Sequence, residues 1–426
     1  MPGDKSISHR AAMIATLASG TSSMRNFSTS ADCAATLSCL TALGVQIERV
    51  GEDLLISGVG GGGLREPKAP LDCGNSGTTM RLLAGILAGQ DFQSTLTGDD
   101  SLRSRPMQRI IEPLRLMGAN ISSNDGRAPL TIQGRTGLNA ISYELLVASA
   151  QVKSCILLAG LSAEGRTEVI ENQTTRDHTE RILRSFGVQV ETGEAEHEGE
   201  NARFVAVNGP ARLSACNVFI PGDVSSAASF IAAAALLPGS SLEMSDIGVN
   251  PTRVLFLNQF RVMGLDVEIT RARENNNEPV GVIRVRGSRK QLSGKFDSPM
   301  TIRGLVVPQL IDELPLLAVV GSQIAGGIEI RDAAELRVKE SDRIATTAQN
   351  LRAMGAVVEE LDDGLRVAGP AELRGAKIDP RGDHRIAMAF TVAALLAEGE
   401  TEITDSECVA VSFPEFFELL ESVVER

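Results

Sequence analysis

The sequence contains an internal repeat with a spacing of roughly seventy residues, far longer than the period of a solenoid. Glycines in matching contexts form two interleaved series that keep the same order along the chain. Glycine suits the position after a helix because it adopts the left-handed conformation at little steric cost. The first series is Gly20, Gly89, Gly165, Gly239, Gly327 and Gly399, and the second is Gly44, Gly118, Gly187, Gly264 and Gly355. The pattern predicts six copies of one small βαβ-type subdomain.

Each copy is expected to hold two helices of different character. The first is almost wholly apolar, as in residues 227–237, which predicts a helix buried on all sides. The second is amphipathic, as in residues 343–354. Asp223 and Asp383 precede buried helices, where an aspartate would act as N-cap. Several helix N-termini directed at one cleft would attract anions without a net positive charge.

The length and charge of the chain restrict its function. A chain of 426 residues is expected to form two or more domains. A formal net charge of −13 argues against nucleic acid as a partner, since phosphate-backbone binding normally needs a basic face. No apolar stretch is long enough for a membrane span, and the start has no apolar signal core, so we expect a cytoplasmic protein with no membrane association.

The cysteines and histidines predict no metal site and no disulfide framework. The six cysteines contain no Cys-x-x-Cys pair, and the four histidines lack metal-ligand spacing. We therefore expect reduced, mostly buried thiols and no metal. The glycine run at 58–63 is expected to be a flexible connection, because the prolines that follow exclude the helix of a dinucleotide-binding loop.

Two segments could bind anions. In the first, i,i+4 spacing places Lys5 beside His9 and Ser6 beside Arg10 at the start of a buried helix, which suits a phosphate or carboxylate receptor or a basic surface turn. The second, residues 72–81 (DCGNSGTTMR), has the composition of an amide-lined anion site or of a structural glycine turn. Taken alone, neither motif decides between its two interpretations.

Four further segments are charged. Residues 101–107 place Arg103 and Arg105 before a predicted helix. Residues 337–343 (RVKESDR) and 383–385 (DHR) lie near later buried helices, and 311–315 (IDELP) adds two carboxylates. Spacing alone favours ordinary salt bridges for these charges.

Together these segments match one family in order. The chain resembles the 5-enolpyruvylshikimate-3-phosphate synthase family from Pro2 to about Phe416, through PGDKSISHR, GNSGTTMRLLAG, SRPM, ASAQVKS, TRDHTER, IDELP, LRVKESDR, DHRIAMAF and SFPEF. The segments ASAQVKS and TRDHTER are similar to those of the bacterial branch of the family called class II.

The resemblance implies an α/β fold of two lobes, each an inside-out barrel of three βαβαββ repeats. We expect residues 5–221 to form the first lobe and 222–426 the second, with residues 1–4 belonging to the second. The boundary is expected near Gly222, since Ile-Pro-Gly-Asp (220–223) repeats the opening Pro-Gly-Asp.

The resemblance also implies an activity, the transfer of the enolpyruvyl group of phosphoenolpyruvate to the 5-hydroxyl of shikimate 3-phosphate, by a monomer that needs no cofactor. By motif, Asp312 is implied as proton acceptor, Glu340 as proton donor, and Lys5 as a catalytic residue that contacts both substrates. The residues implied to bind shikimate 3-phosphate are Lys5, Ser6, Arg10, Ser149, Gln151, Arg176, Asp312 and Lys339. Those implied to bind phosphoenolpyruvate are Lys5, Gly77, Arg105, Gln151, Arg343 and Arg385.

The match departs from the family at three places. Relatives carry a short strand before PGDK and a tail after SFPEFF, so we expect the second lobe to lack one strand here. They also often carry a lysine just before Ser-Phe-Pro, where this chain has Ala410 and Val411.

Three other functions fit less well. A UDP-N-acetylglucosamine enolpyruvyltransferase would open with Lys-Asn and carry a reactive loop cysteine, but Ser6 follows Lys5 and no cysteine lies near residues 103–108. An RNA 3′-phosphate cyclase is disfavoured by the acidity. A non-catalytic anion-binding module would not need Asp312 and Glu340.

Overall fold

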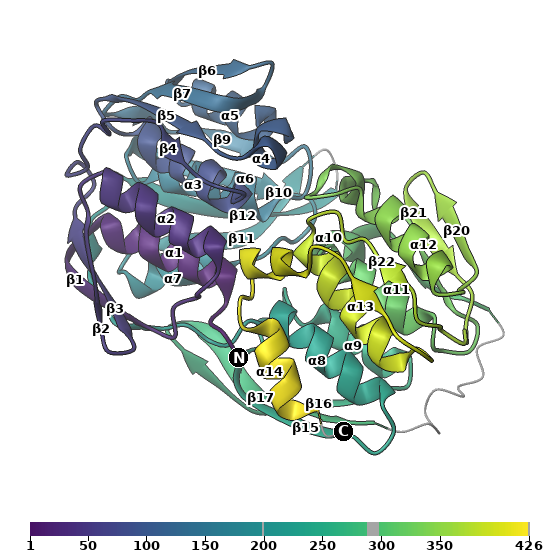
Figure 1. Ribbon diagram of the computed structural model, residues 1–426. Helices are drawn as coiled ribbons and strands as arrows, with labels where there is room; N and C mark the ends of the chain where they lie inside the picture. The colour runs from purple at the N-terminus through teal and green to yellow at the C-terminus, as the bar shows by residue number, and fades with distance from the viewer. Residues whose placement is uncertain (198–199, 288–297, 425–426) are drawn as a thin grey trace. The chain divides into compact units, whose positions relative to one another are not determined.

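The computed structural model describes residues 1–197, 200–287 and 298–424 of the chain (Figure 1). The chain divides into two compact units. The amino-terminal unit comprises Gly3–Pro221 and the short segment Glu274–Glu278, and the carboxy-terminal unit comprises Met1–Pro2, Gly222–Arg273 and Pro279–Arg426. Each unit has its own hydrophobic core of buried aliphatic and aromatic side chains.

The amino-terminal unit contains seven named helices and fourteen named strands among the described residues. Its helices are α1 (Lys5–Thr16), α2 (Ala31–Ala42), α3 (Gly77–Ala88), α4 (Asp100–Ser104), α5 (Gln108–Leu116), α6 (Ala150–Gly160) and α7 (His178–Ser185). Its strands are β1 (Ala18–Arg25), β2 (Gln46–Val50), β3 (Asp53–Val59), β4 (Leu71–Asp72), β5 (Gln93–Thr97), β6 (Asn120–Asn124), β7 (Arg127–Gln133), β8 (Leu138–Asn139), β9 (Ser142–Glu144), β10 (Ala163–Glu171), β11 (Val190–His197), β12 (Glu200–Gly209), β13 (Leu213–Ser214) and β14 (Val218–Phe219).

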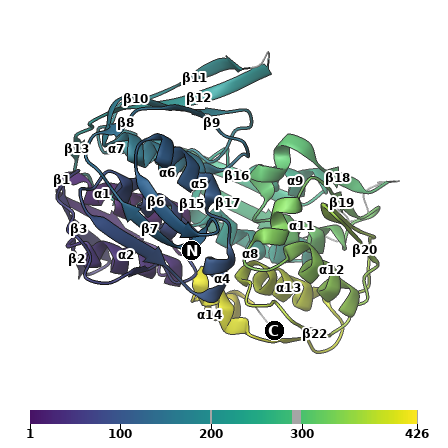
Figure 2. The ribbon, with the colours of Figure 1, turned by 90° about the horizontal axis from the view of Figure 1, so that it is seen from above.

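The three sheets of this unit share one topology. The second sheet has the order β4-β5-β7-β6, in which β4 and β5 are parallel and the other neighbours are antiparallel. The first sheet (β13-β1-β3-β2, with β14 on β1) and the third (β11-β12-β10-β8, with β9 on β10) have equivalent pairings. The largely buried helices α1, α3 and α6 lie inside the unit, and the sheets lie outside. Figure 2 shows α1 and α6 with the sheets of this unit around them. This arrangement is the inside-out α/β architecture.

The carboxy-terminal unit follows the same plan with changes. Its helices are α8 (Val224–Leu236), α9 (Leu255–Val262), η1 (Gly304–Val306), α10 (Val307–Leu310), α11 (Leu314–Gly321), η2 (Ala334–Val338), α12 (Arg343–Ala353), α13 (His384–Leu396), η3 (Ser406–Val411) and α14 (Phe416–Val423). Its strands are β15 (Ser241–Gly248), β16 (Asp266–Asn275), β17 (Glu278–Arg286), β18 (Met300–Ile302), β19 (Ile328–Ile330), β20 (Val358–Leu361), β21 (Gly364–Val367), β22 (Lys377–Ile378) and β23 (Glu402–Ile403).

The last repeat differs from the others. The sheet β18-β19-β21-β20 repeats the topology of the amino-terminal unit, and β15-β17-β16 does so without its first strand. The sixth repeat has only the parallel pair β22-β23, and η3 and α14 follow where the other repeats have a β-hairpin. The assignment of three repeats to each lobe stays a prediction.

The repeat glycines and the caps have the expected conformations, with one exception. All five glycines of the second series have positive φ, as do five of the first, but Gly89 has φ −89°. Asp223 and Asp383 are the N-caps of α8 and α13, and each side chain accepts a backbone N–H of the first turn, as predicted. Every residue of α8 is buried.

Two of the places where the chain passes from one unit to the other lie in related motifs. Pro2-Gly3-Asp4 and Pro221-Gly222-Asp223 exchange backbone hydrogen bonds: Asp4 N donates to Pro221 O at 2.8 Å, and Asp223 N donates to Pro2 O at 2.9 Å. A Cβ at Gly3 would lie 1.8 Å from Asn26 O, so only glycine fits at this position. The two copies of the Pro-Gly-Asp motif therefore lie side by side and bond each other's backbone.

No helix in the described ranges is by itself long and apolar enough to cross a membrane. The bent pair Gly304–Leu310 and Leu314–Gly321 meets the length and composition criteria only when the two are taken together.

Candidate active site

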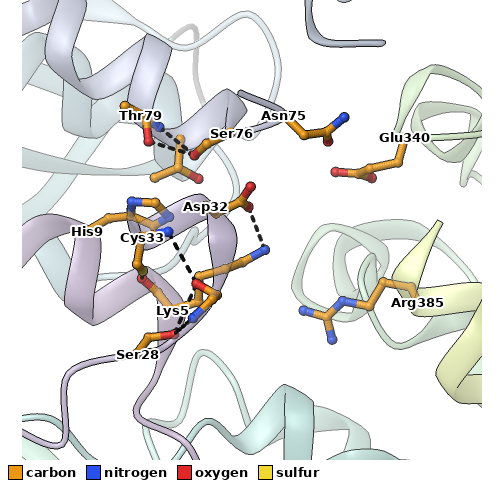
Figure 3. A network of polar contacts seen from close by, with 12 residues as sticks. Lys5, His9, Ser28, Asp32, Cys33, Asn75, Ser76, Thr79, Glu340 and Arg385 are labelled. Carbon is orange, nitrogen blue, oxygen red and sulfur yellow. Dashed lines mark hydrogen bonds and ion pairs between the residues drawn. The ribbon is translucent and has the colours of Figure 1, made fainter. Parts of the chain in front are cut away.

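The start of α1 presents a cation that is held by a carboxylate from the next helix. Asp4 caps α1 by accepting Ile7 N–H at 2.9 Å. Lys5 Nζ lies 2.9 Å from Oδ2 of Asp32, in the first turn of α2, and both side chains are largely buried (Figure 3). Asp32 is not among the site residues predicted from the sequence, because a partner 27 residues away on another helix leaves no spacing signal.

Arg10 lies in the interior of the amino-terminal unit, where it joins helices. Its Nε donates to Thr179 Oγ1 at 2.7 Å, and its Nη2 donates to Ser154 Oγ at 3.0 Å. Its Nη1 donates to the backbone oxygen of Ser6 at 3.0 Å. These bonds link α1 to α6 and α7, so Arg10 has a packing role. Contacts of Arg10 and Ser6 with a phosphorylated substrate stay predictions.

Two arginines crowd the start of α3. Ser76 caps the helix by accepting Thr79 N–H at 3.1 Å, and the helix begins at Gly77. Arg105 Nη2 donates to Asn75 Oδ1 at 2.6 Å, and its Nη1 donates to Asn75 O at 3.3 Å. A Cβ at Gly77 would lie 2.8 Å from Nη1 of Arg81. Helix-start N–H groups and guanidinium groups therefore meet at this point, which favours an anion.

Gln151 and Ser149 lie at the start of α6. Ser149 is the N-cap and accepts Val152 N–H at 3.4 Å. Gln151 Oε1 accepts from Arg81 Nη1 at 2.6 Å, and its Nε2 donates to Thr78 Oγ1 at 2.9 Å. The side chain of Gln151 thus joins α6 to α3, and Arg81 is a member of this cluster to which the sequence analysis gave no role.

Arg176 follows a buried ionic group that anchors its loop. Lys153 Nζ lies 2.7 Å from Glu180 Oε1 and 3.1 Å from Glu171 Oε2, and all three side chains are buried. Glu171 also accepts from Thr175 Oγ1 at 2.7 Å. Burial alone would lower the pKa of Lys153, but the attraction of Glu180 and Glu171 outweighs burial and raises it. The lysine is therefore charged, and Arg176 directly follows Thr175, the loop residue that Glu171 holds.

The carboxy-terminal unit contributes a buried arginine surrounded by carboxylates. Arg343, with a side chain 2% exposed, is the first residue of α12. Its Nε lies 2.8 Å from Asp383 Oδ2, its Nη2 lies 2.7 Å from Glu340 Oε2, and its Nη1 lies 3.5 Å from Asp312 Oδ1. Burial would lower the pKa of Arg343, but Asp383, Glu340 and Asp312 together raise it. The two carboxylates implied for proton transfer therefore share one guanidinium, whose own predicted contact with phosphoenolpyruvate stays untested.

Lys339 and Arg385 are the other cations expected in this unit. Arg385 lies at the start of α13, and its Nη1 is 3.9 Å from Oε1 of Glu313. Lys339 Nζ lies 4.0 Å from Glu335 Oε1, and 27% of its side chain is exposed. Partial burial of its ammonium group lowers the pKa of Lys339, although the negative charges of Asp312, Glu335 and Glu340 act to raise it.

The two groups have different chemical capabilities. The amino-terminal group supplies cations and helix N-termini, which can neutralise phosphate and carboxylate groups. The carboxy-terminal group supplies two part-exposed carboxylates, which can accept and donate protons. No group of three or more His, Cys, Asp or Glu side chains arranged to hold a metal ion occurs in residues 1–197, 200–287 and 298–424.

Comparisons with known proteins identify the family. Residues 1–420 match the family described as EPSP synthase (3-phosphoshikimate 1-carboxyvinyltransferase). The 3-phosphoshikimate 1-carboxyvinyltransferase of Koribacter versatilis is 51% identical over 426 residues, which cover 100% of this chain and 96% of that protein. The enzyme of the same name from Geobacter sp. (strain M21) is 49% identical, with the same coverage.

Solved structures show the same relationship. The EPSP synthase of Acinetobacter baumannii superposes with a TM-score of 0.84 at 41% identity, covering 99% of this chain and 94% of that one. The enolpyruvyl transferase NikO of Streptomyces tendae, at 18% identity, has a TM-score of 0.76 and covers 99% of this chain and 93% of its own, which supports the fold alone. The inside-out α/β fold that the family resemblance implied is thus confirmed, and the chain belongs to the EPSP synthase family.

Proposed function

We propose that this chain transfers the enolpyruvyl group of phosphoenolpyruvate to the 5-hydroxyl of shikimate 3-phosphate, with release of phosphate, in the synthesis of aromatic amino acids. Family membership over residues 1–420 and relatives of about half-identical sequence support this activity. The structural observation that carries the proposal is the cluster in which Arg343 contacts both Asp312 and Glu340.

The reaction needs a base and an acid. Asp312 accepts the proton of the 5-hydroxyl as its oxygen attacks C2 of phosphoenolpyruvate, and Glu340 donates a proton to the methylene carbon C3. The product of this step is a tetrahedral intermediate. Its collapse breaks the bond between C2 and the phosphate oxygen, and the C3 methyl group loses a proton to restore the double bond. Phosphate then leaves as the second product.

Cations bind the two anionic substrates. We assign Lys5, Gly77, Arg105, Gln151, Arg343 and Arg385 to phosphoenolpyruvate. Shikimate 3-phosphate is assigned to Lys5, Ser6, Arg10, Ser149, Gln151, Arg176, Asp312 and Lys339. The contacts of Arg105 with Asn75 and of Gln151 with Arg81 support these assignments, because they fix the donors before a ligand arrives. We further propose that the protein works in the cytoplasm as a monomer and needs no cofactor.

One assay tests the activity. Phosphate release from phosphoenolpyruvate is measured with shikimate 3-phosphate as acceptor and, in a matched reaction, with UDP-N-acetylglucosamine. We expect release with the first acceptor only. Release with UDP-N-acetylglucosamine alone, or with neither acceptor, would refute the proposal.

A further inference from the structure

A row of buried polar side chains joins α1 to the start of α3 by way of α2. His9 lies one turn after Lys5 on α1, and its Nδ1 is 2.7 Å from Thr36 Oγ1 on α2. Thr36 Oγ1 is 2.6 Å from Thr79 Oγ1 on α3. Thr79 Oγ1 in turn donates to Ser76 Oγ at 2.7 Å, and these two residues can be followed in Figure 3. All four of these linked side chains are fully buried.

The hydrogen bonds of this row run in one direction. A threonine hydroxyl has a single proton, so Thr79, which donates to Ser76, must accept from Thr36. Thr36 has then used its own proton and must accept from His9. The ring of His9 therefore carries its proton on Nδ1, and every donor in the row points toward the start of α3.

The other ring nitrogen supports this tautomer. Nε2 of His9 is buried and has no hydrogen-bond partner among the residues that the structure describes. Burial, together with the charges of Lys5 and Arg10, holds the pKa of His9 well below 6.5. A neutral ring with Nδ1–H leaves Nε2 as an unpaired acceptor, whereas a proton on Nε2 would be an unpaired buried donor.

The row ends at the group that begins the anion site. Ser76 is the N-cap of α3, and Gly77 is the first residue of the helix. We propose that His9 is a positioning residue, which acts through Thr36 and Thr79 to hold the α3 N-terminus at a fixed place relative to Lys5 on α1. The inference rests on the proposed function, in which Lys5 and Gly77 both contact phosphoenolpyruvate.

A polar row suits this task better than apolar packing. Apolar side chains of the same shape would fill the space with little loss of stability, but would tolerate small shifts of one helix along another. A row of directional hydrogen bonds is satisfied in one geometry only. The next residue, Arg10, makes comparable links from α1 to α6 and α7.

The test compares variants that break the row with variants that keep it. Thr36→Val and His9→Leu remove a donor at nearly constant shape. Thr36→Ser and His9→Asn keep the hydrogen-bond donor. Serine retains the hydroxyl, and the amide nitrogen of asparagine can take the place of Nδ1. Thr41→Val is the matched control, since the Thr41 hydroxyl, also on α2, donates to Leu37 O of its own helix.

We expect the two breaking variants to raise the KM for phosphoenolpyruvate about tenfold, the effect of one misplaced hydrogen-bonding group. The dissociation constant of shikimate 3-phosphate should change less than about twofold, because none of the residues assigned to that substrate lies on α3, the helix whose start the row positions. The keeping variants and Thr41→Val should stay within about threefold of wild type in both quantities.

Two kinetic outcomes would overturn the inference. One is an unchanged KM for phosphoenolpyruvate in a Thr36→Val protein that melts at a lower temperature, which would make the row purely structural. The other is an equal loss of affinity for both substrates. Failure of the proposed function looks different, because the wild-type protein would not turn over, or Lys5→Ala would leave the KM for phosphoenolpyruvate unchanged.

A second measurement does not depend on turnover. Nitrogen-15 NMR of histidine-labelled protein reports which ring nitrogen carries the proton, and His9→Asn assigns the signals of His9. We expect the Nδ1–H form in the wild type. An Nε2–H ring would reverse the direction of the row and refute the inference even if Thr36→Val failed to fold.

Discussion

Arg343 Nη2 lies 2.7 Å from Glu340 Oε2, within a cluster in which the same guanidinium also contacts Asp312 and the fully buried Asp383. Because Asp383 remains in place when Glu340 or Asp312 is neutralised, the arginine keeps a partner in either single variant. Chemistry and folding can therefore be tested separately at this site.

We predict that Glu340→Gln and Asp312→Ala lower kcat by about 10²–10⁴-fold, the usual contribution of a positioned acid or base. The dissociation constants of both substrates should change only modestly, because the assigned lysines and arginines supply most of the attraction for the anionic groups. Steady-state kinetics with binding titrations measure both effects.

A control and a second readout sharpen this test. Glu335→Gln neutralises a nearby carboxylate that lies 4.0 Å from Lys339 and should keep near-normal turnover. In deuterated solvent, wild-type turnover should introduce deuterium into phosphoenolpyruvate, and Glu340→Gln should suppress this exchange. Normal turnover and exchange in Glu340→Gln would reduce its contact with Arg343 to a structural ion pair.

Asp383→Ala should lower the free energy of unfolding by about 3–5 kcal/mol, since it deprives the buried charge of Arg343 of its one fully buried carboxylate partner among the three that contact it. It also removes the N-cap of α13. Urea unfolding followed by circular dichroism measures the loss. Glu243→Ala, which breaks the exposed pair with Arg284 in the same unit, should cost no more than about 1 kcal/mol. Equal losses in the two variants would contradict the prediction.

Gly77→Ala should raise the KM for phosphoenolpyruvate about tenfold while leaving stability unchanged or slightly higher. The new Cβ would lie 2.8 Å from Nη1 of Arg81, a flexible side chain that can move but would then release Gln151. Kinetics and thermal melting test this prediction.

The contrasting substitution is Gly85→Ala in the same helix. Its Cβ would lie 2.2 Å from the backbone oxygen of Cys155, which cannot move aside cheaply, so stability should fall. A Gly77→Ala protein that is as unstable as Gly85→Ala would show that crowding at Arg81 is not relieved by side-chain movement.

Stability should decline in mild acid because of His9. Its folded pKa lies below 6.5, so below that pH the unfolded chain binds more protons than the native state. The free energy of unfolding should fall by up to about 1.4 kcal/mol per pH unit until the folded pKa is reached. His9→Asn should remove this component. Urea unfolding of the wild type and of His9→Asn, at about pH 7.5 and about pH 5.5, measures this component. An equal fall in the free energy of unfolding of the two proteins between these pH values would contradict the prediction.

The sequence predicted the repeating architecture because its signals are local. Gly44, Gly118 and Gly355 adopt positive φ as the repeat requires, and Asp223 and Asp383 cap the helices that follow them. A helix stop or a cap depends on a few neighbouring residues, so one sequence contains the information. The family motifs then named the functional residues, although their contacts with substrates stay predictions.

The pairing of charges was decided only by the tertiary structure. Asp32 binds Lys5 from 27 residues away, Asp383 binds Arg343 from 40 away, and Ser154 and Thr179 bind Arg10 from 144 and 169 away. The spacing of residues along the chain does not predict such contacts, because they form only when separate helices pack together. The same packing of separate helices places His9 beside Thr36, 27 residues away, at one end of the buried row. Local residue chemistry thus determined the elements, and the arrangement of those elements in space determined which side chains act together.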